Sequence, residues 1–318
     1  KEGAHSRARI LHCKDMTGKE INSKLIAQVK ELKNVSIFEN STLVDLLVAG
    51  DRCHGAVLRD QAGKLSNVYA QSTLLATGGI GGLFSKTTNF AHLTGDAIAI
   101  ALKHGIRVKD LDYVQIHPTS LYTGRSGRAF LMSESLRGEG AILVGKDGQR
   151  FADELLPRDL LTKAIYTQME KDRLPYVRML LKGHVEESIA GRFPGIHAHC
   201  LQEGYDLVED YIPVVPAQHY FMGGIAVDLN SKTSLANLYA AGETSCNGIH
   251  GKNRLASNSL LESLVFSKRA AQAIDESFQC ALPYPFPEPD ARSIEAGLKE
   301  ANRKLLEEIG IEEEAHAK

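Results

Sequence analysis

Apolar side chains recur at two different periods in the first part of the chain, and this predicts a helix followed by short strands. Between Thr17 and Leu32 they recur at helical spacing, and Thr17 and Glu20 are spaced as in a capping box, so we expect a helix that ends near residue 34. Short apolar stretches separated by polar turns then predict strands. These stretches cover residues 35–38, 42–48, 55–59 and 68–75.

The pattern changes again further along the chain. An apolar run ends at a tight turn, Thr77-Gly78-Gly79, and a helix is expected from Asp96 to Gly105. Residues 113–218 are rich in His, Arg and Pro and show no strong strand periodicity. Patterns of short strands return over 221–227 and 237–241, and a helix at 260–277 and a charged helical tail close the chain.

This order of patterns predicts an α/β (α+β) fold in which one domain is interrupted by another. Residues 1–112 and 219–275 would form the two parts of one domain, 113–218 a domain packed over it, and 276–318 a helical tail. Small ligands usually bind in clefts between such domains. We therefore expect the polar side chains of the interrupting segment to converge on such a cleft.

Composition and charge limit the classes of function. The chain is 43% hydrophobic and 24% charged, as in soluble globular proteins, and its net charge of −2 favours neither a nucleic acid nor an anionic membrane as partner. No apolar run approaches the roughly 18 residues of a membrane span, so the cytoplasm is the expected location. Five cysteines without CxxC spacing argue against a disulfide framework and structural zinc, and no metal site is predicted.

Six short motifs follow one another between residues 115 and 262. They are Gln115–Thr119 (QIHPT), Arg137–Gly140 (RGEG), Pro157–Asp159 (PRD), His219–Gly224 (HYFMGG), Ala241–Glu243 (AGE) and His250–Glu262 (HGKNRLASNSLLE). Singly, each has an ordinary explanation: an arginine beside an aspartate is usually a surface ion pair, and a histidine before a proline is usually structural. Together and in this order, they resemble the flavoprotein subunits of fumarate reductase, succinate dehydrogenase and L-aspartate oxidase.

The resemblance implies a fold and a cofactor. Residues 1–112 and 219–275 would be the remainder of an FAD-binding Rossmann-like domain, and 113–218 would be a substrate-capping domain that interrupts it. The N-terminal βαβ unit with a GxGxxG motif, which carries most adenine and pyrophosphate contacts in this family, is not in the sequence. We therefore expect the chain to be a fragment of a larger FAD-dependent protein.

The choice of substrate within the family depends on the first residues. The stretch Glu2-Gly3-Ala4-His5-Ser6-Arg7 resembles the L-aspartate oxidases, whereas succinate and fumarate enzymes usually carry Gln at the position of His5. Aspartate differs from succinate by an ammonium group, and Glu2 is the carboxylate that the family would bring near it. Leaving a buried ammonium without a partner costs about 2–5 kcal/mol, enough to discriminate between the two substrates. Without the resemblance, Glu2 would be a solvated residue near a chain end.

The roles of individual residues are implied by the same resemblance. Arg254, His117, His219 and Ser133 would bind the two carboxylates, Ser133 standing where relatives commonly have Thr, and Glu2 would bind the ammonium. Arg158 would transfer the proton, and because an arginine is a poor base it needs Glu134 or Arg137 as a relay. The residues expected near FAD are Thr77, Gly78, Gly79, Asp96, Glu243, Ser259 and Leu260.

The implied activity is the FAD-dependent oxidation of L-aspartate to iminoaspartate, the first step of NAD biosynthesis through quinolinate. L-Aspartate and other C4 dicarboxylates would be ligands, quinolinate synthase a partner, and dioxygen or fumarate the electron acceptor. Two alternatives stay open at this stage. One is a fumarate reductase or succinate dehydrogenase flavoprotein, and the other is a non-catalytic truncated chain that binds dicarboxylates.

Overall fold

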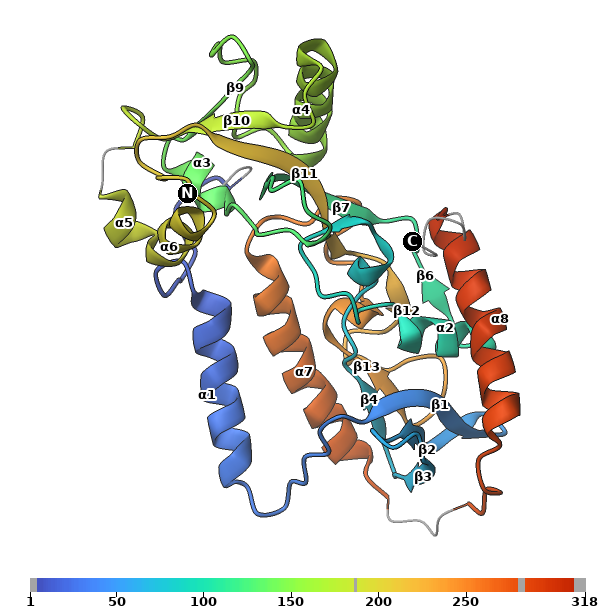
Figure 1. The fold of residues 1–318 in the computed structure, drawn as a ribbon. Helices are drawn as coiled ribbons and strands as arrows, with labels where there is room; N and C mark the ends of the chain where they lie inside the picture. The colour runs from blue at the N-terminus through green and yellow to red at the C-terminus, as the bar shows by residue number, and fades with distance from the viewer. Residues whose placement is uncertain (1–4, 186–187, 280–283, 312–318) are drawn as a thin grey trace.

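The computed structural model describes residues 5–185, 188–279 and 284–311 (Figure 1). Its helices are α1 (Thr17–Glu31), α2 (Asp96–Lys103), α3 (Glu134–Gly138), α4 (Arg158–Asp172), α5 (Ile189–Arg192), α6 (Pro194–Gln202), α7 (Asn258–Ser277) and α8 (Ala291–Ile309). Its longer strands are β1 (Thr42–Ala49), β2 (Arg52–Arg59), β3 (Leu65–Tyr69), β7 (Val114–Leu121), β10 (Val177–Leu180) and β11 (Ile212–Phe221). The short strands are β4 (Thr73–Leu75), β5 (Lys86–Thr87), β6 (Val108–Lys109), β8 (Gly127–Arg128), β9 (Ile142–Val144), β12 (Gly224–Ala226), β13 (Leu238–Ala240) and β14 (Ser245–Cys246). The predicted mixed α/β class is confirmed.

The strands form four separate sheets. β1, β2 and β3 make an antiparallel meander, and β4 pairs in parallel with β13. The largest sheet has the order β8-β5-β11-β10-β9, with β7 paired to β11 in the antiparallel sense. β6, β12 and β14 form the fourth sheet. In Figure 1, the sheet that contains β9, β10 and β11 lies at the top, and the meander lies at the bottom.

The described residues form two large hydrophobic cores and a small third cluster of Val44, Leu47, Val57 and Ile294. One core draws its buried residues from 46–111, from 221–240 and from α8. The other draws all of its buried residues from 121–214. β5 and β11 connect the two halves, because β5 pairs with β11 at Thr87 and Gln218. We propose on this basis that 113–218 is a capping domain inserted into a domain formed by its flanking segments.

Four local expectations were wrong, each for a physical reason. Thr17 is the first helical residue of α1 and accepts a hydrogen bond from the Cys13 amide, so it does not serve as the N-cap, which falls at Met16. Residues 35–38 are exposed and pair with no strand. The stretch 68–75 is divided between β3 and β4, which belong to different sheets. Residues 113–218 contain β7 to β10 and most of β11, and the two longest of these strands, β7 and β11, lack alternation because they are covered on both faces.

The C-terminal helix α8 contributes to the first core. Its residues Ile294, Ala301, Leu305 and Ile309 are buried, and the helix packs against α2. Residue Leu305 also approaches Gly95, where an added Cβ would lie 2.9 Å from the Leu305 side chain. The predicted helical tail therefore covers one face of the interrupted domain (red in Figure 1).

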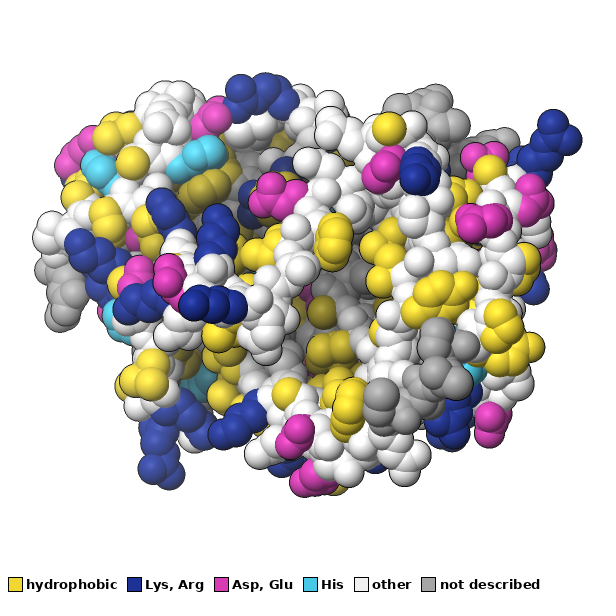
Figure 2. Space-filling view, turned by 90° about the horizontal axis from the view of Figure 1, so that it is seen from below, with side chains coloured by type: hydrophobic (Ala, Val, Ile, Leu, Met, Phe, Trp, Pro, Cys, Tyr) yellow, Lys and Arg dark blue, Asp and Glu magenta, His cyan; other side chains and the backbone are white. Residues whose placement is uncertain are grey.

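Large apolar side chains are exposed on α1 and α7. α1 buries no residue, and Leu25 and Ile26 are about half exposed. On α7, Leu261 and Leu264 are similarly exposed. Figure 2 shows hydrophobic side chains around a hollow in the face seen from below. Exposed apolar surface of this kind is typical of faces that contact other polypeptide segments. None of the helices that the structure describes is long and apolar enough to cross a membrane.

Candidate active site

A buried hydrogen-bond network connects the two cores. The Gln115 side chain on β7 accepts a hydrogen bond from Arg158 of α4 at 2.7 Å. Its amide nitrogen donates to the Asn253 side chain and to the Arg254 carbonyl oxygen, both at 2.8 Å. Asn253 in turn donates to Asp159 at 3.0 Å. Residues from α4, β7 and the loop before α7 therefore meet at one point, although 139 positions separate Gln115 from Arg254.

Arg158 belongs to a buried group of two arginines and one glutamate. Its Nε donates to Glu134 Oε2 at 2.8 Å, and Arg137 Nη2 lies 3.5 Å from the same oxygen. Arg137 also donates to the Glu154 carbonyl oxygen at 2.5 Å. All three side chains are less than a tenth exposed. The ordinary interpretation of Arg158 as a surface ion pair with Asp159 is therefore wrong, because its guanidinium points inward to Glu134.

Two histidines face each other beside this group. The rings of His117 and His219 lie edge to face with centroids 5.1 Å apart, and His117 is 1% exposed. Burial lowers the pKa of both imidazoles well below 6.5, and the positive charge of Arg158 lowers them further. Both rings are therefore neutral at pH 7. Neutral histidines bind carboxylates as hydrogen-bond donors.

Arg254 carries a buried positive charge next to the histidines. Its side chain stacks over the Tyr220 ring at 4.3 Å, and the residue is 4% exposed. Its Nε has no hydrogen-bond partner among the described residues. Burial, together with the charge of Arg158, lowers its pKa to about 10, so it is still a cation at pH 7. A buried cation with an unused donor is a site for an anionic ligand.

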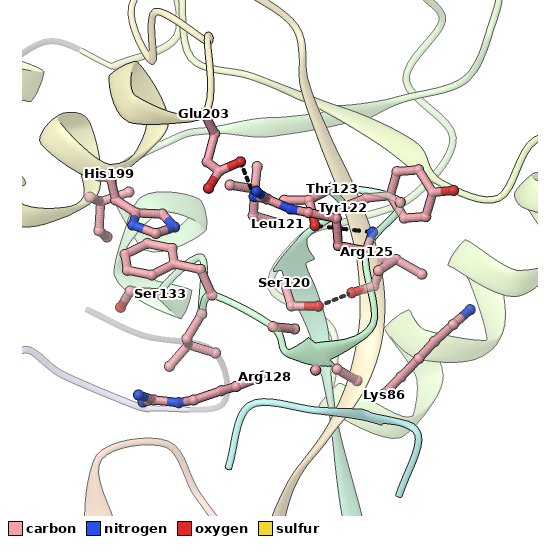
Figure 3. Close-up of a pocket in the computed structure, with 18 of the residues that line it drawn as sticks. Lys86, Ser120, Leu121, Tyr122, Thr123, Arg125, Arg128, Ser133, His199 and Glu203 are labelled. Atoms are coloured by element: carbon pink, nitrogen blue, oxygen red, sulfur yellow. Dashed lines mark hydrogen bonds and ion pairs between the residues drawn. The ribbon is translucent and has the colours of Figure 1, made fainter. Parts of the chain in front are cut away.

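Ser133 connects the network to a neighbouring cavity. It caps α3 through a hydrogen bond from the Ser135 amide and lies directly before Glu134. It also lines a cavity of about 740 Å³, together with Lys86, Arg128 and His199. Figure 3 shows this cavity, with Arg125 paired to Glu203 at its rim. Ser133 is thus shared by the cavity and by the segment that carries Glu134 and Arg137.

Three points of the structure concern the residues predicted to bind FAD. Gly79 lies against the Glu243 carboxylate, where a Cβ would come within 2.6 Å of Oε1, so only glycine leaves room there. Burial raises the pKa of Glu243 to about 7, and a neutral carboxyl can donate as well as accept a hydrogen bond. Thr77 bonds to Thr244, beside Glu243, at 3.0 Å. The turn after β4 and the turn after β13 therefore form one surface.

The start of α7 provides the third point. Ser259 and Leu260 lie in its first turn, and its N-cap, Ser257, makes no side-chain capping hydrogen bond. Free amides at a helix N-terminus attract the electron-rich edge of a ligand. Asp96 opens α2 and accepts a hydrogen bond from Thr94 at 2.8 Å, so its carboxylate is engaged within its own segment.

The N-terminal motif is described only from His5 onward, so Glu2 lies outside the described residues. His5 is buried, and its Nε2 is 3.0 Å from the Ala256 carbonyl oxygen, two residues after Arg254. His5 is therefore held next to the loop that carries Arg254.

Sequence reasoning missed several residues of this network. Gln115 and Asn253 fall inside recognised motifs but were given no role, and the structure shows that they join the two halves. Thr88 was missed altogether, although its hydroxyl lies 2.8 Å from His219 Nδ1. A threonine carries no signal of its own in a sequence, because its partner here is 131 positions away.

Comparison with protein families agrees with this architecture. A family model described as an FAD binding domain matches residues 1–260. The L-aspartate oxidase of Clostridium perfringens is 52% identical over 276 residues, covering 86% of this chain and 63% of that protein. The L-aspartate oxidase of Neisseria meningitidis serogroup B is 40% identical over 308 residues, covering 94% and 61%. The chain thus spans less than two thirds of the length of these relatives.

Solved structures show the same relationship. A chain of E. coli quinol fumarate reductase superposes with a TM-score of 0.80 at 31% identity, covering 95% of this chain and 55% of that chain. The open conformation of a flavocytochrome c3 fumarate reductase gives a TM-score of 0.64 at 25% identity, covering 87% and 59%. The chain therefore belongs to the FAD-binding domain family, uses FAD as its cofactor and has L-aspartate oxidases among its relatives.

Proposed function

We propose that the protein containing this chain oxidises L-aspartate to iminoaspartate. The observation that carries the proposal is the buried Arg254 cation, with its unused Nε, beside two neutral histidines and Arg158. A dicarboxylate supplies the missing negative charge and accepts hydrogen bonds from the donors that surround it. The identity of 52% with an L-aspartate oxidase favours aspartate over other C4 dicarboxylates.

In this proposal, five side chains bind the substrate. Arg254 binds one carboxylate with its guanidinium, and His117 and His219 donate hydrogen bonds from their neutral rings. Ser133 adds a hydroxyl donor, and Glu2 binds the ammonium group. The two cationic arginines and the lack of water in a buried site strengthen each of these interactions. Binding therefore fixes the Cα–H bond in one orientation.

Proton transfer is proposed for Arg158, Glu134 and Arg137. Oxidation of aspartate removes a hydride from Cα and a proton from the nitrogen. An arginine is a poor base, so Arg158 moves a proton only if another group replaces the one it gives or takes. Glu134 Oε2 is 2.8 Å from Arg158 Nε and provides that relay, and Arg137 stabilises the Glu134 carboxylate.

The chemistry that bound FAD would supply is acceptance of this hydride. Gly79, Thr77, Glu243 and the first turn of α7 are the residues proposed to hold it, with Gly78 and Asp96 nearby. Iminoaspartate is unstable in water, so we further propose that quinolinate synthase uses it, as a step in NAD biosynthesis, and that both proteins act in the cytoplasm.

The proposal is tested with the FAD-loaded protein under anaerobic conditions. L-Aspartate should bleach the flavin absorbance near 450 nm and release ammonia and oxaloacetate as the imine hydrolyses, while succinate should bind without bleaching it. Bleaching by succinate with none by aspartate would identify a succinate dehydrogenase or fumarate reductase instead. Bleaching by neither substrate would refute the oxidase function and favour the non-catalytic dicarboxylate-binding alternative.

A further inference from the structure

A three-residue segment, Thr87–Asn89, makes hydrogen bonds to Gln218 and to His219, the first residue of the HYFMGG motif. The Thr88 amide donates to the Gln218 carbonyl oxygen at 2.9 Å, and the Thr87 hydroxyl donates to Gln218 Oε1 at 2.7 Å. The Asn89 side chain donates to Gln218 Oε1 and to the His219 carbonyl oxygen, both at 3.0 Å. The backbone around His219 is therefore fixed from a segment that lies 131 positions earlier in the chain.

Thr88 also reaches the imidazole of His219. Its Oγ1 is 2.8 Å from His219 Nδ1 and 3.4 Å from the Gln218 carbonyl oxygen. That carbonyl already accepts the Thr88 amide proton. Of the two acceptors, Nδ1 is closer to the hydroxyl, and only the carbonyl oxygen already accepts another hydrogen bond from Thr88. The hydroxyl proton is therefore expected to point to Nδ1. If Nδ1 accepts a proton in a hydrogen bond, a neutral ring must carry its own proton on Nε2.

The carbonyl of Thr88 is held as well. Arg128, which lines the cavity in Figure 3, donates from Nε to the Thr88 carbonyl oxygen at 2.8 Å, and its guanidinium lies 4.1 Å from the centre of the Phe90 ring. Thr88 is 6% exposed. Hydrogen bonds at its amide and at its carbonyl consequently hold Thr88 in place. Burial shields its hydroxyl from water, which would otherwise compete for Nδ1.

We propose that Thr88 is a positioning residue that fixes the tautomer of His219, so that Nε2 presents a proton to a carboxylate of the substrate. His117 differs, because its Nδ1 lies 2.9 Å from the carbonyl oxygen and 3.2 Å from the amide nitrogen of Thr119, so the backbone alone surrounds it. This proposal rests on the proposed dicarboxylate function.

The test compares Thr88→Val and Thr88→Ser in the FAD-loaded protein. Valine has the shape of threonine without the hydroxyl, so both tautomers of His219 should become populated. A carboxylate bound by His219 in the ground state and in the transition state loses one hydrogen bond, so KM should rise about 10-fold while kcat stays within about twofold. Serine restores the hydroxyl and should restore KM. Thr87→Val is the matched control, because it removes the adjacent hydroxyl, which contacts Gln218 and no imidazole.

A second measurement does not depend on turnover. ¹⁵N spectra of the histidine side chains, with His219 assigned from a His219→Asn variant, report which ring nitrogen carries the proton. We expect the Nε2–H form in the unsubstituted protein and in Thr88→Ser, and a mixture in Thr88→Val. An unchanged His219 signal in the valine variant, or equal KM values in the serine and valine variants, overturns the proposal.

Failure of this proposal and failure of the oxidase function are distinguishable. If the unsubstituted protein does not oxidise aspartate, the function fails, and the dissociation constant of succinate, measured from its effect on the flavin spectrum, replaces KM. The valine variant should then bind succinate about 10-fold more weakly than the serine variant. Equal affinities would refute the positioning role whatever the reaction is.

Discussion

Replacing Arg254 with methionine should stabilise the ligand-free protein while abolishing dicarboxylate binding. Burial and the nearby Arg158 lower the pKa of Arg254 from 12.5 to about 10. The folded protein therefore holds this proton less tightly than the unfolded chain, and the penalty is fully present at every pH below about 10. The difference in pKa corresponds to about 3 kcal/mol of destabilisation. Replacing the arginine removes this destabilisation, but the loss of the stacking contact with Tyr220 offsets about 1–2 kcal/mol of the gain in stability.

We therefore expect Arg254→Met to raise the free energy of unfolding by about 1–2 kcal/mol at pH 7. Urea denaturation of the apo protein with and without succinate measures both effects. A ligand at 100 times its dissociation constant stabilises by about 2.7 kcal/mol, and the variant should lose that increment entirely. Arg269→Met is the matched control, because Arg269 also lies over an aromatic ring, Phe266, but is exposed and should change stability by less than about 1 kcal/mol.

If Arg254→Met is less stable than the unsubstituted protein in the absence of ligand, Arg254 is a structural residue. Its buried charge would then serve the fold and not the binding of an anionic ligand. A variant that is more stable and yet still gains stability from succinate would show that the dicarboxylate binds elsewhere.

Three further substitutions test the cofactor surface and substrate choice. Because the pKa of Glu243 is raised to about 7, the stability that its protonated form contributes is complete below pH 4.5 and is lost as the pH rises through 7. Between pH 5 and pH 8, the free energy of unfolding of Glu243→Gln should fall by about 2–3 kcal/mol less than that of the unsubstituted protein, because glutamine does not titrate. Unfolding of the apo protein at the two pH values measures this difference, and identical pH profiles would contradict the raised pKa. Gly79→Ala should lower the flavin content, because its Cβ would lie 2.6 Å from the Glu243 carboxylate, whereas Gly18→Ala has open space and should not. Glu2→Gln should lower kcat/KM for aspartate by about 30-fold or more and spare dicarboxylates without an amine, and equal losses would make Glu2 structural.

The sequence by itself determined the family, the cofactor and the positions of four helices, α1, α2, α7 and α8. The helix predicted from Asp96 and the one predicted over 260–277 correspond to α2 and α7, because helical periodicity and terminal signals are local properties. The motifs identified the flavoprotein family because their order along the chain is specific even where each one is short. Their residues were assigned roles by resemblance, and those roles remain proposals.

Only the tertiary structure decided which polar groups meet. The capping box predicted at Thr17 was wrong because the Thr17 hydroxyl accepts a hydrogen bond from the Cys13 amide in the preceding turn. The strands β7 and β11 were not visible in the sequence, because strands buried on both faces do not alternate. The partners of Gln115 and Thr88 lie more than 120 positions away, so no local pattern could indicate them. The charge of Arg254 could be read from the sequence, but its burial within reach of the charge of a second arginine, Arg158, arises only when the two cores fold together.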